Sequence, residues 1–534
     1  MVKGSTCIKG WQFHDPDVDY LIKMINLAPQ YSINHIELSH DIIIQIGQVY
    51  NSESTKRAVE VASALAYRRG IDTYCWSMEM SYIPNEYIRD GKIDFDKGEL
   101  WKWFEDQYRM FFTDFPKVKG VILSFGDMCH YHIYDDFEII TSLSKKDRIK
   151  RVIDIVYGVC KEYNKDLMIR DWAGGQVVSE VIQSSPKDIK VMTKTVIGDW
   201  SPIDINNPNI GKYGDRDLLI EFDLNGEKAG RSWMPWCCPQ DIKYRWNHAK
   251  QFPNVIGAVG RIDTCDSVGS RIFCIPHTVI SELGVDHAYD TANEVNLYAF
   301  SKVLNNPSID IDGVWNKWAT NKYGTKAAPY VISALKRSWD IINLLYWRRL
   351  YIVFSYVVPR LEYLERIAEE EGYLGQKLEY FIEEQNAIDA LEEWHKPIED
   401  LCNASLGDID ECQEYLTEEE YRDLRCQIEM ALLYSDVWKQ IYKTFIRYEI
   451  TKKHPSPEQN KLLSLDMDRC VLLANYIDKK YGPNTWPSNP MRIRNFIETI
   501  RFTLNYYQKQ ALRSPDGPDG DLSNKTLHMI KWSK

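Results

Sequence analysis

The chain has 534 residues, of which 44% are hydrophobic and 27% are charged, and this length favours two or three domains over one compact core. Its 65 lysine and arginine residues and 77 acidic residues give a net charge of −12, which argues against nucleic acid or an anionic membrane surface as the partner. No stretch of the sequence is long and apolar enough for a transmembrane helix.

The N-terminus and the cysteines bear on the compartment. The first six residues lack the apolar region of a signal peptide, so we expect a soluble protein that is cytoplasmic, or periplasmic or secreted if a leader has been removed. The 12 cysteines include no CxxC pair, which predicts free thiols in the core. The 17 tryptophans and 33 tyrosines suit the binding of sugar rings, although we expect most of them to pack inside the protein.

The first 300 residues alternate short apolar runs with amphipathic stretches of helical period. The apolar runs are the predicted strands: Ile8–Phe13, Asn34–Ser39, Asp72–Ser77, Gly120–Ser124, Leu167–Arg170, Ile189–Thr193, Leu218–Phe222 and Val255–Val259. Eight such repeats predict an α/β fold, a (β/α)8 TIM barrel. A doubly wound sheet is the alternative, but no glycine-rich phosphate turn follows the first strand.

Beyond residue 300 the pattern is helical almost throughout. Long apolar stripes of helical period run through Ala327–Trp347 and Glu418–Lys452, and the alternation typical of strands is absent from this part of the sequence. We therefore expect a catalytic barrel over residues 1–300 and a large all-α C-terminal domain over residues 301–534. The stripes lead us to expect that the helices pack against the barrel and that a homodimer forms through the helical domain.

Acidic residues recur at the predicted ends of the strands, where barrel enzymes carry their catalytic groups. They are Glu37, Glu79, Asp127, Asp171, Asp199, Glu227 and Asp263. Cleavage of a glycosidic bond needs one carboxylic acid that protonates the leaving oxygen and one carboxylate that activates water or attacks the anomeric carbon. Tryptophans stand next to several of these acids, and burial against an aromatic ring raises a carboxyl pKa toward that of a general acid. For most of these strand-end acids, the alternative to a catalytic role is that of a helix cap or a solvated charge in a loop.

Other chemistries have less support in the sequence. His130 and His132 lie near Asp127, but the pair has no third ligand at a diagnostic spacing, so we expect neither a metal nor a cofactor. The Gly-x-Ser-x-Gly motif of serine hydrolases is absent. Cys237 and Cys238 have no histidine placed to activate a thiol, so we expect both to be buried.

Part of the chain, about residues 10–325, resembles the α-glucuronidases, glycoside hydrolases that remove 4-O-methylglucuronic acid from xylo-oligosaccharides. The best matching segments are Lys194–Trp200 and Glu221–Glu227. In that family an aspartate followed by an aromatic residue, and a glutamate further along, share the activation of water in an inverting reaction. Asp199 and Glu227 stand at the matching positions, so the resemblance implies this role for them.

The chain departs from that family at other positions. The general acid of the family is a glutamate after the fourth strand, and the nearest acid here is Asp127, which is one carbon shorter. The lysine that helps to hold the uronic carboxylate is replaced by Ser124, whereas the family's arginine after the fifth strand is matched by Arg170. The N-terminal β-domain of the family has no counterpart, because the predicted barrel begins within the first ten residues.

These features predict an inverting, exo-acting glycoside hydrolase on an oligosaccharide, with a terminal uronic acid as the sugar removed. In this hypothesis Asp127 protonates the leaving oxygen, while Asp199 and Glu227 position and deprotonate the attacking water. Two alternatives stay open: a retaining glycosidase on a neutral sugar, and a catalytically inactive barrel that binds glycans or proteins. Carboxyl groups about 6.5–9.5 Å apart indicate inversion, and a separation of about 5–5.5 Å indicates retention.

Five side chains are candidates for binding the sugar. Arg170 would hold an acidic group through two parallel hydrogen bonds, with Arg261 after the eighth strand as a second cation. In the alternative, Arg170 pairs with a strand-end acid and orients it. Trp172, Trp200 and Trp11 are candidates for stacking on the sugar ring, and packing inside the protein is an equally good expectation for each of them.

Overall fold

The chain forms two compact units: Met1–Tyr356 with Trp394–Asp436, and Val357–Glu393 with Val437–Lys534. The computed structural model describes residues 7–125, 133, 139–171, 175–197, 200, 205–227, 229–230, 232, 234–264, 287–347, 361, 364–365, 386–481 and 490–511. None of the helices in these described residues combines the length and the apolarity needed to cross a bilayer.

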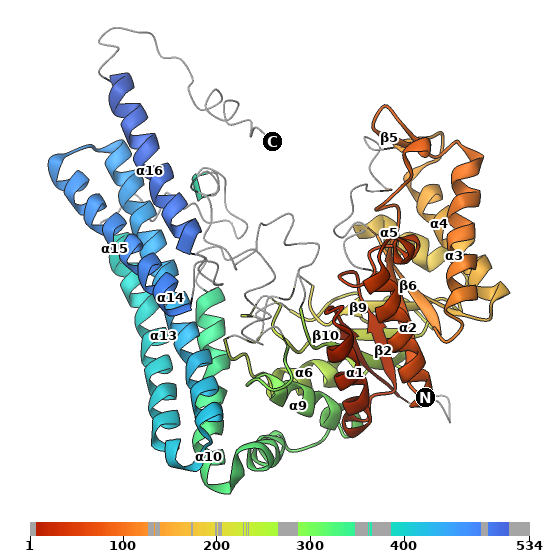
Figure 1. The fold of residues 1–534 in the computed structure, drawn as a ribbon, viewed down its shortest axis with the longest axis horizontal. Helices are drawn as coiled ribbons and strands as arrows, with labels where there is room; N and C mark the ends of the chain where they lie inside the picture. The colour runs from red at the N-terminus through yellow and green to blue at the C-terminus, as the bar shows by residue number, and fades with distance from the viewer. Residues whose placement is uncertain are drawn as a thin grey trace. The chain divides into compact units, whose positions relative to one another are not determined.

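The first unit contains a closed barrel of eight parallel strands in the order β1-β11-β10-β9-β8-β6-β3-β2. Figure 1 labels β2, β6, β9 and β10 of this barrel. The strands are β1 (Ile8–Phe13), β2 (His35–Leu38), β3 (Asp72–Met78), β6 (Gly120–Ser124), β8 (Asp166–Arg170), β9 (Lys190–Lys194), β10 (Leu218–Asp223) and β11 (Val255–Arg261). The predicted (β/α)8 fold class is therefore confirmed. A separate three-stranded sheet joins β4 (Ile88–Arg89), β5 (Lys92–Asp94) and β7 (Ile139–Ile140).

Helices follow most of the barrel strands, and several begin at a polar cap. They are α1 (Val18–Leu27), α2 (Glu53–Arg68), α3 (Gly98–Asp114), α4 (Lys145–Glu162), α5 (Gly175–Ser184) and α6 (Pro239–Ala249). Asp17, Ser52 and Ser144 each accept a hydrogen bond from a backbone N–H in the first turn of α1, α2 and α4, which satisfies a donor that has no partner within the helix.

The remaining described helices confirm the expected all-α C-terminal region. They are α9 (Glu294–Asn305), α10 (Ile311–Trp347), α13 (Asn386–Glu411), α14 (Glu418–Lys453), α15 (Pro457–Tyr481) and α16 (Pro490–Ala511). Figure 1 shows α14, α15 and α16 as long blue helices. In the second unit α15 packs against α16, and Arg447 of α14 pairs with Asp466 of α15 at 3.1 Å.

The interior of the barrel changes from apolar to polar along the strands. The lower layer is a hydrophobic cluster: Ile8, Tyr74, Ile122, Met168, Met192, Leu219 and Val259. Further along each strand, on the same inward face, stand eight buried side chains that we call the polar ring: Gln12, Glu37, Trp76, Ser124, Arg170, Lys194, Glu221 and Arg261. The carboxyl ends of all eight strands therefore present polar or aromatic groups at one end of the barrel.

The barrel closes where the first strand meets the last. Ile8 pairs with Gly257 in the parallel ladder between β1 and β11. A Cβ atom at Gly257 would lie 2.1 Å from the backbone oxygen of Ile8, so only glycine allows the two strands to approach this closely.

Glu79 follows β3 and is buried, and its carboxyl group accepts a hydrogen bond from Tyr108 of α3. Burial raises the pKa of Glu79 from 4.5 to about 7. Because the folded protein holds this proton to higher pH than the unfolded chain, the stability that the group contributes is present at low pH and is lost as the pH rises from 4.5 to about 7.

The unmodified protein should lose unfolding free energy between about pH 4 and about pH 8. In the Glu79→Gln protein we expect this loss to be smaller by about 1 kcal/mol or more. Urea unfolding at both pH values measures this loss. Glu60→Gln, at an exposed position of α2, is the matched control and should leave the pH dependence of stability unchanged. The same pH dependence in the Glu79→Gln protein and in the unmodified protein would contradict the raised pKa.

Candidate active site

Glu37 anchors one side of the polar ring. Its carboxylate accepts hydrogen bonds from Trp76 Nε1 at 3.0 Å, from His35 Nε2 at 2.9 Å and from Gln12 Nε2 at 3.4 Å. These donors come from β3, β2 and β1, so a single buried carboxylate joins three neighbouring strands. A buried carboxylate is tolerated only when donors surround it in this way.

Arg170 and Glu221 form a buried pair across the polar ring. Arg170 Nε donates to Glu221 Oε2 at 2.8 Å and Nη2 donates to Oε1 at 3.0 Å, so the guanidinium and the carboxylate share two parallel hydrogen bonds. The guanidinium carbon also lies 4.7 Å from the centroid of the Trp76 ring. Of the two expectations for Arg170, the structure favours the one in which it orients a strand-end acid, because Glu221 occupies the edge that would hold a sugar carboxylate.

Glu227 lies in the turn after β10 and pairs with Arg261. Arg261 Nη1 donates to Glu227 Oε2 at 2.6 Å, and Arg261 Nε donates to the backbone oxygen of Asp263 at 3.2 Å. The guanidinium therefore joins the turn after β10 to the end of β11, and Glu227 stands at the carboxyl end of the barrel, as the sequence predicted for a catalytic residue.

Asp223 shapes that turn. Its carboxylate accepts backbone N–H groups from Asn225 at 3.1 Å, from Gly226 at 2.9 Å and from Glu227 at 2.6 Å. Gly226 has a φ of 79°, which glycine adopts without strain. Burial raises the pKa of Asp223 to about 7, while nearby Arg261 lowers it and Glu227 raises it. A carboxyl group that titrates near neutrality thus lies directly beside one that is paired with an arginine.

The other predicted site residues fall in different places. Asp127, Asp199 and Trp172 lie outside the described residues. Trp200 is 4% exposed, has a φ of 62°, and has the Lys194 ammonium 4.7 Å from its ring centroid. Trp200 and Asp223 also line a cavity of about 20 Å³, which has room for about one water molecule.

The expectation that Trp11 stacks on a sugar is wrong. Trp11 is 0% exposed, and its ring centroid lies 5.2 Å from that of Tyr31. Side chains alternate along a strand, and its neighbour Gln12 faces the barrel interior, so Trp11 faces the surrounding helices. It packs between the barrel and the helical layer.

Two of the strand-end acids expected from the sequence, Glu79 and Asp171, make contacts that stabilise the structure. Glu79 points outward to Tyr108 of α3, as described above. Asp171 accepts hydrogen bonds from Thr193 at 3.0 Å, Asn209 at 3.0 Å and Tyr213 at 2.9 Å, and burial raises its pKa. These contacts tie the loop after β9 to the barrel.

Two groups at this end of the barrel were not predicted from the sequence. Glu221 and Lys194 belong to the polar ring but were not singled out, although their place on the inward face follows from strand alternation once the register is known. His14 and Asp41, at the ends of β1 and β2, lie 2.6 Å apart between His14 Nδ1 and Asp41 Oδ2. Both are buried, and neither lies in a recognisable motif.

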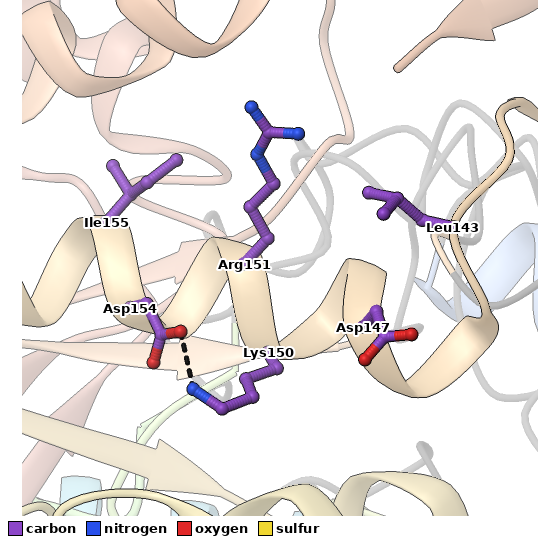
Figure 2. A pocket seen from close by; sticks show the side chains of 6 residues that line it. All are labelled: Leu143, Asp147, Lys150, Arg151, Asp154 and Ile155. Atoms are coloured by element: carbon purple, nitrogen blue, oxygen red, sulfur yellow. Dashed lines mark hydrogen bonds and ion pairs between the residues drawn. The ribbon is translucent and has the colours of Figure 1, made fainter. Parts of the chain in front are cut away.

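A shallow pocket lies elsewhere, along α4 (Figure 2). Lys150 and Asp154, which line this pocket, form an ion pair at 2.5 Å on the surface of α4. Leu143, just before α4, also lines it. None of its lining residues stands at the end of a barrel strand. We therefore assign it no part in the chemistry of the polar ring.

Comparison with known proteins supports the fold. No protein-family model and no curated protein matches this chain. Among solved structures, a GH138 enzyme targeting pectin rhamnogalacturonan II is similar with a TM-score of 0.63 at 10% sequence identity, over 97% of this chain and 69% of that one. A mutant O-GlcNAc hydrolase from Thermobaculum terrenum is similar with a TM-score of 0.45 at 11% identity, over 96% of this chain and 97% of that one. At 10% identity the similarity to the GH138 enzyme shows a shared fold alone, and membership of the α-glucuronidase family is not shown.

Proposed function

We propose that this chain is a glycoside hydrolase that acts on an oligosaccharide at the carboxyl ends of its barrel strands. The observation that carries the proposal is the placement of Glu227 at the carboxyl end of the barrel, where Arg261 donates to its carboxylate at 2.6 Å and Asp223 fixes the backbone of its turn. Sites that cleave glycosidic bonds combine protonated and ionised carboxyl groups. The fold shared with a pectin-targeting glycoside hydrolase gives further support.

Glu227 serves as the water-activating carboxylate in this proposal. The guanidinium of Arg261 donates to Glu227 Oε2 at 2.6 Å and so holds the carboxylate in place. Asp223 is a positioning residue, because its hydrogen bonds to the backbone of the turn fix where Glu227 stands. Glu221, held by Arg170, adds a second arginine-bound carboxyl group to the same end of the barrel.

The proposed reaction is a single displacement with inversion. Glu227 and Asp199 orient a water molecule, whose oxygen bonds to the anomeric carbon while its proton passes to a carboxylate. The glycosidic bond breaks on the opposite side, and the leaving oxygen takes a proton from Asp127. The roles of Asp127 and Asp199 rest on the sequence, and those of Glu227 and its partners rest also on the geometry described above.

An acidic terminal sugar fits the charges of the polar ring. The ring contains three cations, Arg170, Lys194 and Arg261, and two carboxylates, Glu37 and Glu221. Lys194 stands between β8 and β10, which carry the buried pair, and its ammonium group lies over an indole ring. We propose that Lys194, with Arg261, attracts the carboxylate of a uronic acid, and that Arg170 acts through Glu221. Trp172, by its place in the sequence, remains a candidate for stacking on the sugar, whereas Trp200 is buried with Lys194 over its ring.

Replacing Glu227 tests the catalytic assignment. We expect Glu227→Gln to lower kcat by about 10²–10⁴-fold on oligosaccharides and on activated aryl glycosides alike, because water must be activated whatever group leaves. Asp127→Asn should spare aryl glycosides in part, since their leaving groups need less protonation. Activity is measured on defined oligosaccharides with acidic and neutral terminal sugars, and the anomer formed first is identified by NMR.

Glu60→Gln on the exposed face of α2 is the matched control and should keep full activity. Circular dichroism checks that the Glu227→Gln protein is folded. Full activity in a folded Glu227→Gln protein would reject the assignment. A first product with retained configuration would replace inversion with a double displacement, and a protein inactive on every glycoside would favour the binding alternative.

Replacing Lys194 tests the acidic sugar. We expect Lys194→Met to raise KM on a uronic-acid substrate by about tenfold or more relative to its neutral counterpart, because a charged hydrogen bond contributes about 1.5–3 kcal/mol. Arg170→Met should instead lower activity on both substrates equally, since it disturbs the position of Glu221. An equal loss on both substrates in the Lys194→Met protein would leave a neutral-sugar glycosidase.

A further inference from the structure

Three side chains at the ends of β1 and β2 form a cluster that the proposed reaction does not use. His14 follows β1, and His40 and Asp41 follow β2. Each offers one ligand atom, and within the described part of the chain these atoms lie within 4.8 Å of one another. His14 and Asp41 are buried, and His40 is partly exposed. Two imidazoles and one carboxylate are a common donor set for zinc.

The hydrogen bonds of His14 define which of its nitrogens faces Asp41. His14 Nε2 lies 3.0 Å from Gln12 Oε1, and because an amide oxygen can only accept, Nε2 carries a proton. The orientation of the Gln12 amide follows from its other contact, since its Nε2 donates to Glu37 Oε2 at 3.4 Å. His14 Nδ1 therefore faces Asp41 Oδ2, at 2.6 Å.

His14 Nδ1 also lies 2.8 Å from Ser39 Oγ, and His40 Nε2 lies 3.7 Å from Asp41 Oδ1. His14 Nδ1 and Asp41 Oδ2 are in direct hydrogen-bond contact at 2.6 Å, whereas two ligands of one tetrahedral zinc stand about 3.3 Å apart. An ion bound here would therefore replace this hydrogen bond, with the two atoms less than about 1 Å further apart.

We propose that His14, His40 and Asp41 bind one divalent transition-metal ion, with zinc as the best match. The ring centroids of His14 and His40 lie 5.1 Å apart with an interplanar angle of 86°. Two histidines on one tetrahedral zinc, with Zn–N distances of about 2.0–2.1 Å, place their centroids about 5 Å apart. His40 Nε2 lies 3.7 Å from Asp41 Oδ1, near the separation of about 3.3 Å expected between two ligands of one zinc.

The surroundings of His14 match those of a metal ligand. Metal-binding histidines donate their second ring N–H to an oxygen acceptor, which here is Gln12 Oε1. The backbone N–H of His14 donates to Asp263 Oδ1 at 2.5 Å, which fixes the chain at this point. Three protein ligands leave a fourth position for water or a sugar hydroxyl. The His40 ring lies 5.6 Å from the ring of Trp76, so the ion would stand beside the polar ring.

Titration of the metal-stripped full-length protein with Zn²⁺ tests this inference without any measurement of turnover. Calorimetry should give one zinc ion per chain, and Zn²⁺ should raise Tm. Mg²⁺ at the same concentration should do neither, because it prefers oxygen ligands to imidazole. Co²⁺ in place of Zn²⁺ should give visible absorption bands of a site with nitrogen and oxygen ligands.

Variants distinguish specific zinc binding at this cluster from incidental zinc binding elsewhere on the protein. His40→Ala and Asp41→Asn should abolish the calorimetric signal, and Gln12→Ala should weaken binding by about 10–100-fold, as for other residues that orient a metal ligand. His287→Asn is the matched control, because His287 also pairs with an aspartate, Asp15, at 2.7 Å. The partial exposure of His40 makes its replacement the least disruptive to folding.

Two results would overturn the proposal. One is the absence of saturable zinc binding by the unmodified protein. The other is equal weakening of binding by His40→Ala and His287→Asn. Neither result bears on the glycosidase proposal, which uses different residues and a different measurement.

Discussion

The buried pair of Arg170 and Glu221 is the interaction on which the upper half of the barrel depends. The barrel interior changes from hydrocarbon to charged side chains within a few residues of each strand, so each charge there must be neutralised locally, because an unpaired buried ion costs several kcal/mol. Arg170 lies against Trp76 as well as Glu221, and Trp76 in turn donates to Glu37. One connected network therefore joins β8, β10, β3 and β2 above the apolar layer.

Because of this network, the residues that stabilise the barrel and the residues that can take part in chemistry lie at different heights along the strands. The apolar layer holds the barrel together, and the polar ring gives the strand ends fixed side chains on which loop residues can be placed. Glu227 illustrates the result, because it belongs to a turn, yet its position is set at its backbone by Asp223 and at its carboxylate by Arg261. Glu227 is thus held in its turn by residues of two neighbouring barrel strands, β10 and β11.

The fold was predictable from the sequence because its signal is local and repeated, with eight apolar runs separated by amphipathic stretches. The site was only partly predictable, because its contacts are not local. Nothing near Arg170 in the sequence indicates that its partner is Glu221, 51 residues further on, and His14 and Asp41 are 27 residues apart on different strands. Trp11 shows a second limit of prediction from the sequence. Only the register of β1 decides that Trp11 faces the helices and that Gln12 faces the barrel interior.

The contact between Gly257 and Ile8 also has a consequence for how the protein folds during synthesis. The strands that close the barrel hold contacts 249 residues apart along the chain, as between His14 and Asp263. A ribosome must therefore have made almost the whole barrel before β1 can find its second neighbour, and until then both edges of the growing sheet expose unpaired backbone groups. The growing barrel therefore passes through an interval of incomplete strand pairing, which ends only when β11 has been made.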